Sequence, residues 1–258
     1  MQRSAASLVR ILILLMVLLV VALQQFGSRI RTSSWQTPLW AVVYPINADG
    51  SPTTQTFIEE LSEADFGPIA QFLTEEAQAY ELGLNQPVII KLAPEIKSLP
   101  PIPPSEGTLA TIWWSLQTRW WANLEDSFEG PAADIQLFVL YHDPASQTSL
   151  RHSVGIRNGA YALINAFASN NQRGSNQVII THELLHTLGA SDKYRPDSGQ
   201  PIYPDGYAKP DQLPLHPQHY AELMAGRIAL TADQAEIPAS LDQVLIGRAS
   251  ALEIRWLK

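Results

Sequence analysis

Five runs of apolar residues along the chain have the length and composition of β-strands. Runs of about four to eight residues, rich in β-branched and aromatic side chains and bounded by turn residues, are typical of strands. Turn formers follow the first run, and the last two runs are separated by Asn158-Gly159, a dipeptide that favours a tight hairpin. We therefore predict strands at 39–46, 88–92, 134–142, 153–157 and 161–168.

Longer stretches between these runs have the spacing of helices. One helix is predicted from about residue 62 to 82, with Gly67-Pro68 able to delay its start, and another from 108 to 124. The second carries four tryptophans, which we expect to pack against the sheet because each buries a large apolar area. Apolar residues at roughly helical spacing also predict a closing helix over 239–257.

The order of these elements predicts the fold class. Strands and helices alternate at first, and three successive strands then precede an amphipathic helix that ends near Gly189. This order is typical of an α+β domain with a mixed β-sheet backed by helices. The stretch from Arg195 to Pro217 is rich in proline, glycine and tyrosine, which favours an irregular C-terminal subdomain.

Residues 1–27 differ from the rest of the chain. Arg3 and Arg10 precede thirteen consecutive apolar residues, and the stretch widens to nineteen if it is counted from Leu8 to Phe26. Nineteen residues just span a hydrocarbon layer of about 30 Å, whereas thirteen suit a cleaved signal peptide. We expect an uncleaved membrane anchor followed by a polar linker at 28–37, with secretion after cleavage as the alternative. Either way, the remaining domain would lie outside the cytoplasm, in a periplasmic or extracellular space.

Composition and charge limit the classes of partner that the chain could bind. The chain has 258 residues, 46% of them hydrophobic, which suits one sizeable domain over 38–258. Its formal net charge of −8 argues against nucleic acid or an anionic membrane surface as a partner. The absence of cysteine excludes disulfides, and it also excludes a cysteine thiolate as a ligand that would block a metal site.

The most informative chemistry lies in the helix before Gly189. His182 and His186 are four residues apart, so on a helix their imidazoles project from one face and can hold a single metal ion. Glu183 lies beside that face and is better placed to hydrogen-bond a water than to bind the metal itself. The alternative is an ordinary solvated helix face, but only six histidines occur in the chain and two have this spacing.

A third metal ligand is expected shortly after the helix. Gly189 allows a sharp turn that would bring Asp192 back towards the histidines. The complete pattern, His-Glu-x-x-His-x-x-Gly-x-x-Asp, resembles the metzincin metallopeptidases, and aspartate as the third ligand resembles their snapalysin type. The segment from Tyr220 to Gly226 is similar to the methionine-containing turn of that clan, with Met224 at the methionine position.

This resemblance implies a zinc-dependent endopeptidase. His182, His186 and Asp192 would bind Zn²⁺, and Glu183 would be the general base for a metal-activated water that attacks a peptide bond. Tyr194 would be a candidate to stabilise the oxyanion, with a plain packing role as the alternative. The clan also implies a metzincin-like fold divided into subdomains at 38–189 and 190–258, and a peptide or protein substrate lying along an edge strand near 153–168.

Two other functions stay open. In a gluzincin-like peptidase the third ligand would be Glu222 instead of Asp192. In a membrane-anchored binding module the metal site would be vestigial and Glu183 would have no chemical role. His216 and His219 are expected to be packing or solvent-exposed residues, although histidine is a common metal ligand.

Overall fold

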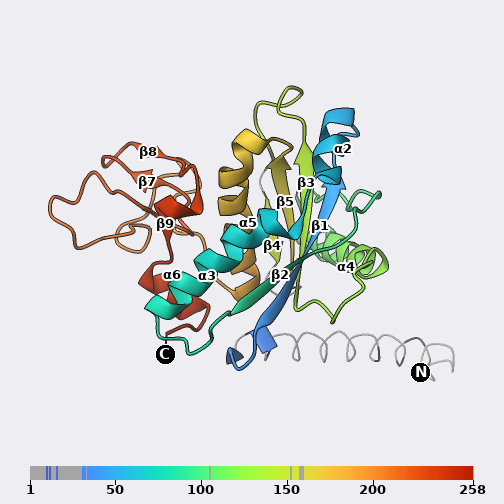
Figure 1. The fold of residues 1–258 in the computed structure, drawn as a ribbon, viewed down its shortest axis with the longest axis horizontal. Coiled ribbons are helices and arrows are strands. Elements are labelled where there is room, and N and C mark those ends of the chain that lie inside the picture. Colours follow the sequence, from blue (N-terminus) through green and yellow to red (C-terminus); the bar gives the residue numbers. More distant parts are fainter. Residues whose placement is uncertain are drawn as a thin grey trace, which may run out of the picture.

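The domain is built on a five-stranded mixed β-sheet with helices on both faces (Figure 1). The computed structural model describes residues 10, 12, 16, 31–32, 34–104, 106–151, 153–156 and 160–257. The strands are β1 (Leu39–Asn47), β2 (Val88–Leu92), β3 (Ile135–His142), β4 (Val154–Ile156) and β5 (Tyr161–Phe167). The predicted strands and the mixed α and β content are therefore confirmed.

The sheet has the order β2-β1-β3-β5-β4, and β4 is an edge strand. β2, β1, β3 and β5 run parallel, whereas β4 pairs antiparallel with β5. The strand register places Val154 opposite Leu163 and Ile156 opposite Tyr161. The antiparallel pairing is the one expected for a hairpin at Asn158-Gly159, but those two residues lie outside the described part of the chain.

Each face of the sheet is buried in its own apolar cluster. Along β1, Ala41 and Val43 belong to one cluster, whereas Val42 and Tyr44 belong to the other. Successive side chains of a strand point to opposite faces, so a strand covered on both sides reads as one continuous apolar run. This explains why the central strands could be predicted from their apolar runs.

Three helices contribute to the apolar cluster on one face and one helix contributes to the cluster on the other. The first face packs against α2 (Pro52–Glu59), α3 (Gly67–Ala79) and α5 (Arg173–Leu188). The second face packs against α4 (Thr108–Leu124). Two short 3-10 turns, at Glu63–Phe66 and Asn170–Gln172, precede α3 and α5.

Helix α2 was not predicted, and the predicted helix over 62–82 is divided. Ser51 caps α2 by accepting a hydrogen bond of 3.0 Å from the Thr54 amide, and Pro52 occupies the first turn. Serine and proline form turns as well as helix starts, so the sequence alone did not separate the two. Downstream, Pro68 near the start of α3 lacks the amide hydrogen needed inside a helix, and the first turn before it is a separate 3-10 segment.

The four tryptophans of α4 do not all pack in the core, so that expectation was wrong in part. Trp114 is buried and Trp121 packs against the same cluster, with its ring centroid 4.9 Å from that of Phe138. Trp113 and Trp120 are 63% and 69% exposed. Neighbouring residues on a helix are about 100° apart, so only one tryptophan of each adjacent pair can face the sheet squarely.

The C-terminal part is irregular as predicted, but the closing helix over 239–257 is wrong. That range contains a 3-10 turn (Leu241–Gln243), strand β9 (Val244–Leu245) and the short helix α6 (Arg248–Glu253). β9 pairs in parallel with β6 (Ala221–Glu222), and this tertiary pairing overrides the helical spacing. A second small sheet joins β7 (Ile228–Ala229) to β8 (Ala235–Glu236).

The N-terminal predictions fall mostly outside the described residues. The apolar run from 11 to 23 is not described apart from single positions, and within the described residues no helix is long and apolar enough to cross a membrane. The expected polar linker at 28–37 includes one core residue, since Trp35 is buried and its indole donates a 2.7 Å hydrogen bond to the Ile254 carbonyl. Arg31 forms a 2.9 Å ion pair with Asp134 at the start of β3, so the domain begins before residue 38.

Candidate metal centre

Helix α5 presents His182 and His186 on one face, as their spacing predicts. The helix is anchored in the core by buried residues on its other faces, including Ile180, Leu184 and Leu185. It ends at Gly189, which adopts the left-handed conformation at φ 115° and ψ 7°. The predicted glycine cap is therefore confirmed, and the chain turns back there towards the helix.

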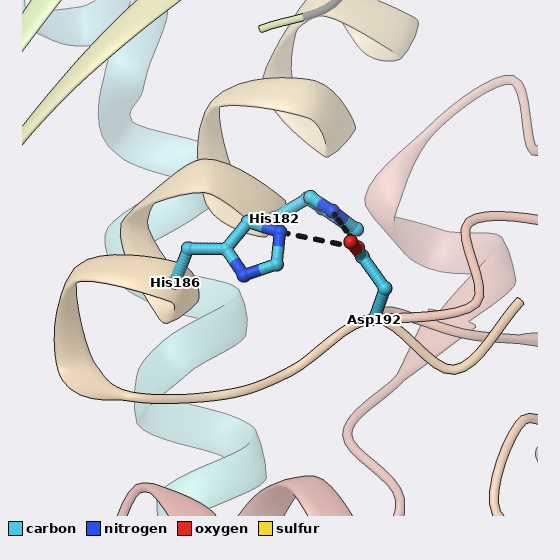
Figure 2. Close-up of side chains that lie close together, drawn as sticks. All are labelled: His182, His186 and Asp192. Atoms are coloured by element: carbon cyan, nitrogen blue, oxygen red, sulfur yellow. Dashed lines mark ion pairs between the residues drawn. The ribbon is translucent and has the colours of Figure 1, made fainter. Parts of the chain in front are cut away.

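Asp192 is brought to both histidines by that turn (Figure 2). Its Oδ1 atom lies 3.2 Å from His182 Nε2 and 3.1 Å from His186 Nε2. The potential ligand atoms of the three residues all lie within 4.8 Å of one another. The structure thus brings together the three residues that the sequence analysis proposed as ligands.

Hydrogen bonds from the far side of each imidazole fix its orientation. His182 Nδ1 lies 2.9 Å from the Leu223 carbonyl, and His186 Nδ1 lies 2.9 Å from the Ala190 carbonyl. A carbonyl only accepts hydrogen bonds, so each Nδ1 carries a proton, and a ring in its neutral form would direct its Nε2 lone pair towards Asp192. Two lone pairs facing a carboxylate oxygen are unfavourable unless both rings are protonated or a cation lies between them.

The geometry and the donor types fit a zinc ion. With zinc–ligand distances of about 2.0–2.1 Å, neighbouring ligand atoms of a tetrahedral site lie about 3.3–3.4 Å apart. The two histidine–aspartate distances, 3.2 and 3.1 Å, are close to this spacing. Two imidazoles and one carboxylate are a common ligand set for Zn²⁺, and they leave one coordination position open. His182, His186 and Asp192 could therefore hold the metal.

The carboxylate and the imidazoles also shift the pKa values of one another. Burial raises the pKa of Asp192, but hydrogen bonds and positive charge from His182 and His186 outweigh that effect, and the net pKa lies well below its usual range. Burial lowers the pKa of His186, but Asp192, the Ala190 carbonyl and Glu183 together raise it above its usual value. The site is thus built to keep a negative carboxylate facing positive charge.

Glu183 lies in the same cavity but does not join the three ligands. The cavity has a volume of about 320 Å³ and is lined by the residues Ser153, Val154, Gly155, His182, Glu183, His186, Asp192 and Tyr194. Glu183 is 6% exposed, and its Oε2 has no hydrogen-bond partner among the described residues. Burial raises the pKa of Glu183, although both histidines oppose the shift. A buried carboxylate oxygen without a partner, next to a metal-type cluster, is suited to bind a water or a substrate proton.

Gly155 of β4 allows the edge strand to approach α5 closely, and the sequence analysis did not single it out. A β-carbon at this position would lie 2.5 Å from His186 Cβ and 2.8 Å from the Glu183 carbonyl oxygen. Only glycine fits at that distance, so β4 forms one wall of the cavity over the metal-type cluster. A lone glycine within a predicted strand is the signal that could have indicated this close approach.

The loop that carries Asp192 is tied to the C-terminal helix by Lys193 and Glu253, which the sequence analysis also missed. Lys193 is 7% exposed, and its Nζ lies 2.8 Å from both carboxylate oxygens of Glu253. Glu253 also accepts hydrogen bonds from the amide and hydroxyl of Ser191 at 2.8 and 2.7 Å. This cluster holds the residues on either side of Asp192, so it positions the proposed third ligand. No sequence signal links two residues 60 positions apart.

Tyr194 lines the cavity, as expected for either role considered for it. Burial raises its pKa, and the negative charges of Asp192 and Glu183 raise it further. The phenol therefore stays protonated at neutral pH and can act as a hydrogen-bond donor in the cavity. Its backbone forms an isolated β-bridge with Pro201, which fixes the start of the irregular segment.

Met224 and Glu222 lie in one tight turn, and neither lines the cavity that holds the cluster. Met224 is fully buried in the apolar core, and its carbonyl accepts a 2.9 Å hydrogen bond from the Lys193 amide. Glu222 is 0% exposed and accepts hydrogen bonds from Ser250 Oγ at 2.7 Å and the Ala225 amide at 2.9 Å. The alternative in which Glu222 is the third ligand is therefore not supported, because its carboxylate is engaged within the C-terminal part.

His216 and His219 also remain apart from the cluster, as expected. His216 is half-buried, and its Nε2 lies 3.1 Å from the Tyr207 hydroxyl. His219 is exposed. Among the described residues, the only group of three or more histidines and carboxylates that could hold a metal is His182, His186 and Asp192.

Comparison with known proteins adds no family assignment. No known family matches the sequence, and no curated protein is significantly similar to it.

Proposed function

We propose that this chain is a zinc-dependent endopeptidase with His182, His186 and Asp192 as the metal ligands. One observation carries the proposal: Asp192 Oδ1 lies 3.2 and 3.1 Å from two histidine Nε2 atoms, beside Glu183, whose buried Oε2 has no hydrogen-bond partner among the described residues. A metal-binding cluster alone would serve a structural role as well. The adjacent carboxylate supplies what hydrolysis needs in addition.

Each residue has a distinct task in this proposal. The bound ion would supply Lewis acidity, which polarises a carbonyl oxygen and makes water nucleophilic at neutral pH. Glu183 accepts a proton from the attacking water and donates it to the leaving amine. The buried setting that raises the pKa of Glu183 favours this exchange, because a carboxylate with a raised pKa is a stronger base towards the attacking water. Tyr194 donates a hydrogen bond to the oxyanion that develops on the former carbonyl.

The substrate in this proposal is an extended polypeptide paired with β4. β4 lies at the edge of the sheet, and three of its flanking or constituent residues, Ser153, Val154 and Gly155, line the cavity. An edge strand leaves backbone groups available for main-chain hydrogen bonds with an added strand. A peptide bound there would cross the cavity that holds Glu183.

A metzincin relationship and an extracytoplasmic location remain part of the proposal. The tight turn around Met224 contacts the active helix, since the Leu223 carbonyl accepts the hydrogen bond from His182 Nδ1, and this arrangement supports the proposed likeness. Residues 1–27 are proposed to tether the protein to a membrane. Full-length protein should then stay with membranes after a carbonate wash, and recovery of a soluble form starting after Ala22 would contradict the anchor.

The test separates metal binding from chemistry with two substitutions. Glu183→Gln should retain one zinc per chain, because Glu183 is not a ligand, yet lose about 10²–10⁴-fold in turnover of a peptide. Asp192→Ala should lose most of the zinc and all activity. Zinc content is measured by elemental analysis and turnover with a quenched fluorescent peptide.

The same experiment distinguishes the alternative of a binding module. A wild-type protein that holds zinc tightly but cleaves no peptide would favour that alternative. Full activity in Glu183→Gln would refute the proposed general base, and retention of zinc in Asp192→Ala would refute the proposed third ligand.

A further inference from the structure

A second cavity lies on the opposite side of β4 from the proposed catalytic residues. It has a volume of about 370 Å³ and lies between the proline-rich connection before α4 and the ends of β3 and β5. Its apolar lining includes Leu99, Ile102, Trp114, Leu140, Val154 and Leu163. Pockets of about 300–1,000 Å³ with mostly apolar walls are the usual size of ligand-binding sites.

Edge strand β4 joins this cavity to the proposed catalytic one. Val154 lines both cavities. Gly155 faces α5, as its close approach to His186 shows, and the alternation of a strand directs Val154 and Ile156 to the other face. A peptide paired with β4 has the same alternation, so one of its side chains faces the catalytic cavity and the next faces the second cavity.

We propose that the second cavity is a specificity pocket that takes a bulky apolar side chain of the substrate, close to the bond that is cleaved. This inference rests on the proposed peptidase function and adds the class of substrate to it. In this proposal the specificity for substrate depends on residues of the proline-rich connection, β3 and α4. None of these segments contributes a proposed metal ligand or the proposed base.

The walls of the pocket suit an apolar side chain better than a charged one. Leu140 and Leu163 lie on the sheet, and Trp114 closes the pocket from α4. The indole of Trp114 donates a 2.8 Å hydrogen bond to the Pro101 carbonyl, which holds the proline-rich wall in place. Four polar residues also line the pocket, namely His142, Gln147, Arg151 and Asn165, but Arg151 is exposed and its charge is hydrated. A charged side chain inserted among the apolar walls would therefore lose its hydration without gaining a buried counter-ion, whereas an aromatic or large aliphatic one would gain burial.

The rim of the second cavity also favours an apolar substrate side chain. Leu99 and Ile102 are 57% and 79% exposed, although both are large apolar residues that line the cavity. Apolar side chains that stay exposed beside a cavity are common at sites where a partner covers them. A substrate side chain seated in the pocket would bury this rim.

The test uses full-length protein loaded with zinc and a set of peptides that differ at one position, within three residues on either side of the cleaved bond. At one of these positions, phenylalanine or leucine should give about 10- to 100-fold higher kcat/KM than alanine, which corresponds to burial of one large apolar side chain. Leu140→Trp fills the pocket, so it should remove this preference. Cleavage of the alanine peptide should stay as in the wild type.

Two further variants keep the result decisive if Leu140→Trp disturbs folding. Leu99→Ala shortens an exposed rim residue and should reduce the preference several-fold. Leu116→Trp makes the same change as Leu140→Trp on the exposed part of α4 outside the pocket, and it should leave the preference intact. Zinc content of each variant reports whether the site is still formed.

The failures of the two proposals are distinguishable. If the wild type cleaves peptides without a preference for a bulky apolar residue, or if the preference survives in both Leu140→Trp and Leu99→Ala, the pocket assignment is wrong and the peptidase function stands. If the wild type cleaves none of the peptides, the proposed function fails and the pocket assignment fails with it.

Discussion

Replacing Gly155 by alanine tests whether close contact between β4 and α5 builds the site. The added β-carbon would lie 2.5 Å from His186 Cβ and 2.8 Å from the Glu183 carbonyl oxygen. Carbon atoms in contact prefer about 3.5–4.0 Å, so strand and helix must separate by roughly 1 Å. Overpacking of this kind costs about 1–3 kcal/mol of stability, and a misplacement of about 1 Å at a catalytic site can cost about 10²-fold in rate.

Activity, zinc content and thermal unfolding of Gly155→Ala together decide the outcome. We expect kcat/KM to fall by about 10²-fold with a smaller loss of stability. Gly67→Ala is the matched control, because a β-carbon there meets no atom within 4 Å. If Gly155→Ala had wild-type activity and zinc content, the close approach would not matter for the site and β4 would not be the wall that we describe.

Three further substitutions test the surroundings of the site. Burial raises the pKa of Glu76 to about 7 from its ordinary value of 4.5. The folded protein therefore holds this proton more tightly than the unfolded chain, so the contribution of Glu76 to stability is fully present below pH 4.5 and is lost as pH rises through 7. Glu76→Gln should abolish this loss, up to about 3 kcal/mol, in urea unfolding at pH 5 and pH 8, whereas exposed Glu60→Gln should not. Lys193→Met should weaken zinc binding about 10–100-fold in a competition titration, as typical for residues that orient ligands, and unchanged affinity would contradict its positioning role. Glu222→Gln should lower the melting temperature but keep one zinc per chain, and zinc loss would reopen it as a ligand.

The strands and the helix that carries His182 and His186 could be predicted because their signals are local. A strand buried on both faces is a continuous apolar run, and the spacing of His182 and His186 follows from the helix repeat. Asp192 could be proposed because Gly189 ends the helix in a left-handed turn, which leaves few directions for the next three residues.

The missed features depend on contacts between distant parts of the chain. Gly155 matters because β4 packs on α5, and Lys193 matters because Glu253 lies beside it, 60 residues further on. The prediction of a closing helix failed for the same reason, since the pairing of Val244–Leu245 with Ala221–Glu222 replaces a helical turn with a strand. Helical spacing predicts which residues share a face, but it does not reveal a partner elsewhere in the sequence.

The central claim, that the chain is a zinc-dependent peptidase, is tested most directly by metal removal and return. Cleavage of an unfolded protein substrate is followed before chelation, after removal of the metal by dialysis against a chelator, and after addition of one equivalent of Zn²⁺. We predict that cleavage stops when the metal is removed and returns with one equivalent per chain. Cleavage that continues in the metal-free protein, or a zinc-loaded protein that cleaves nothing, would contradict the account.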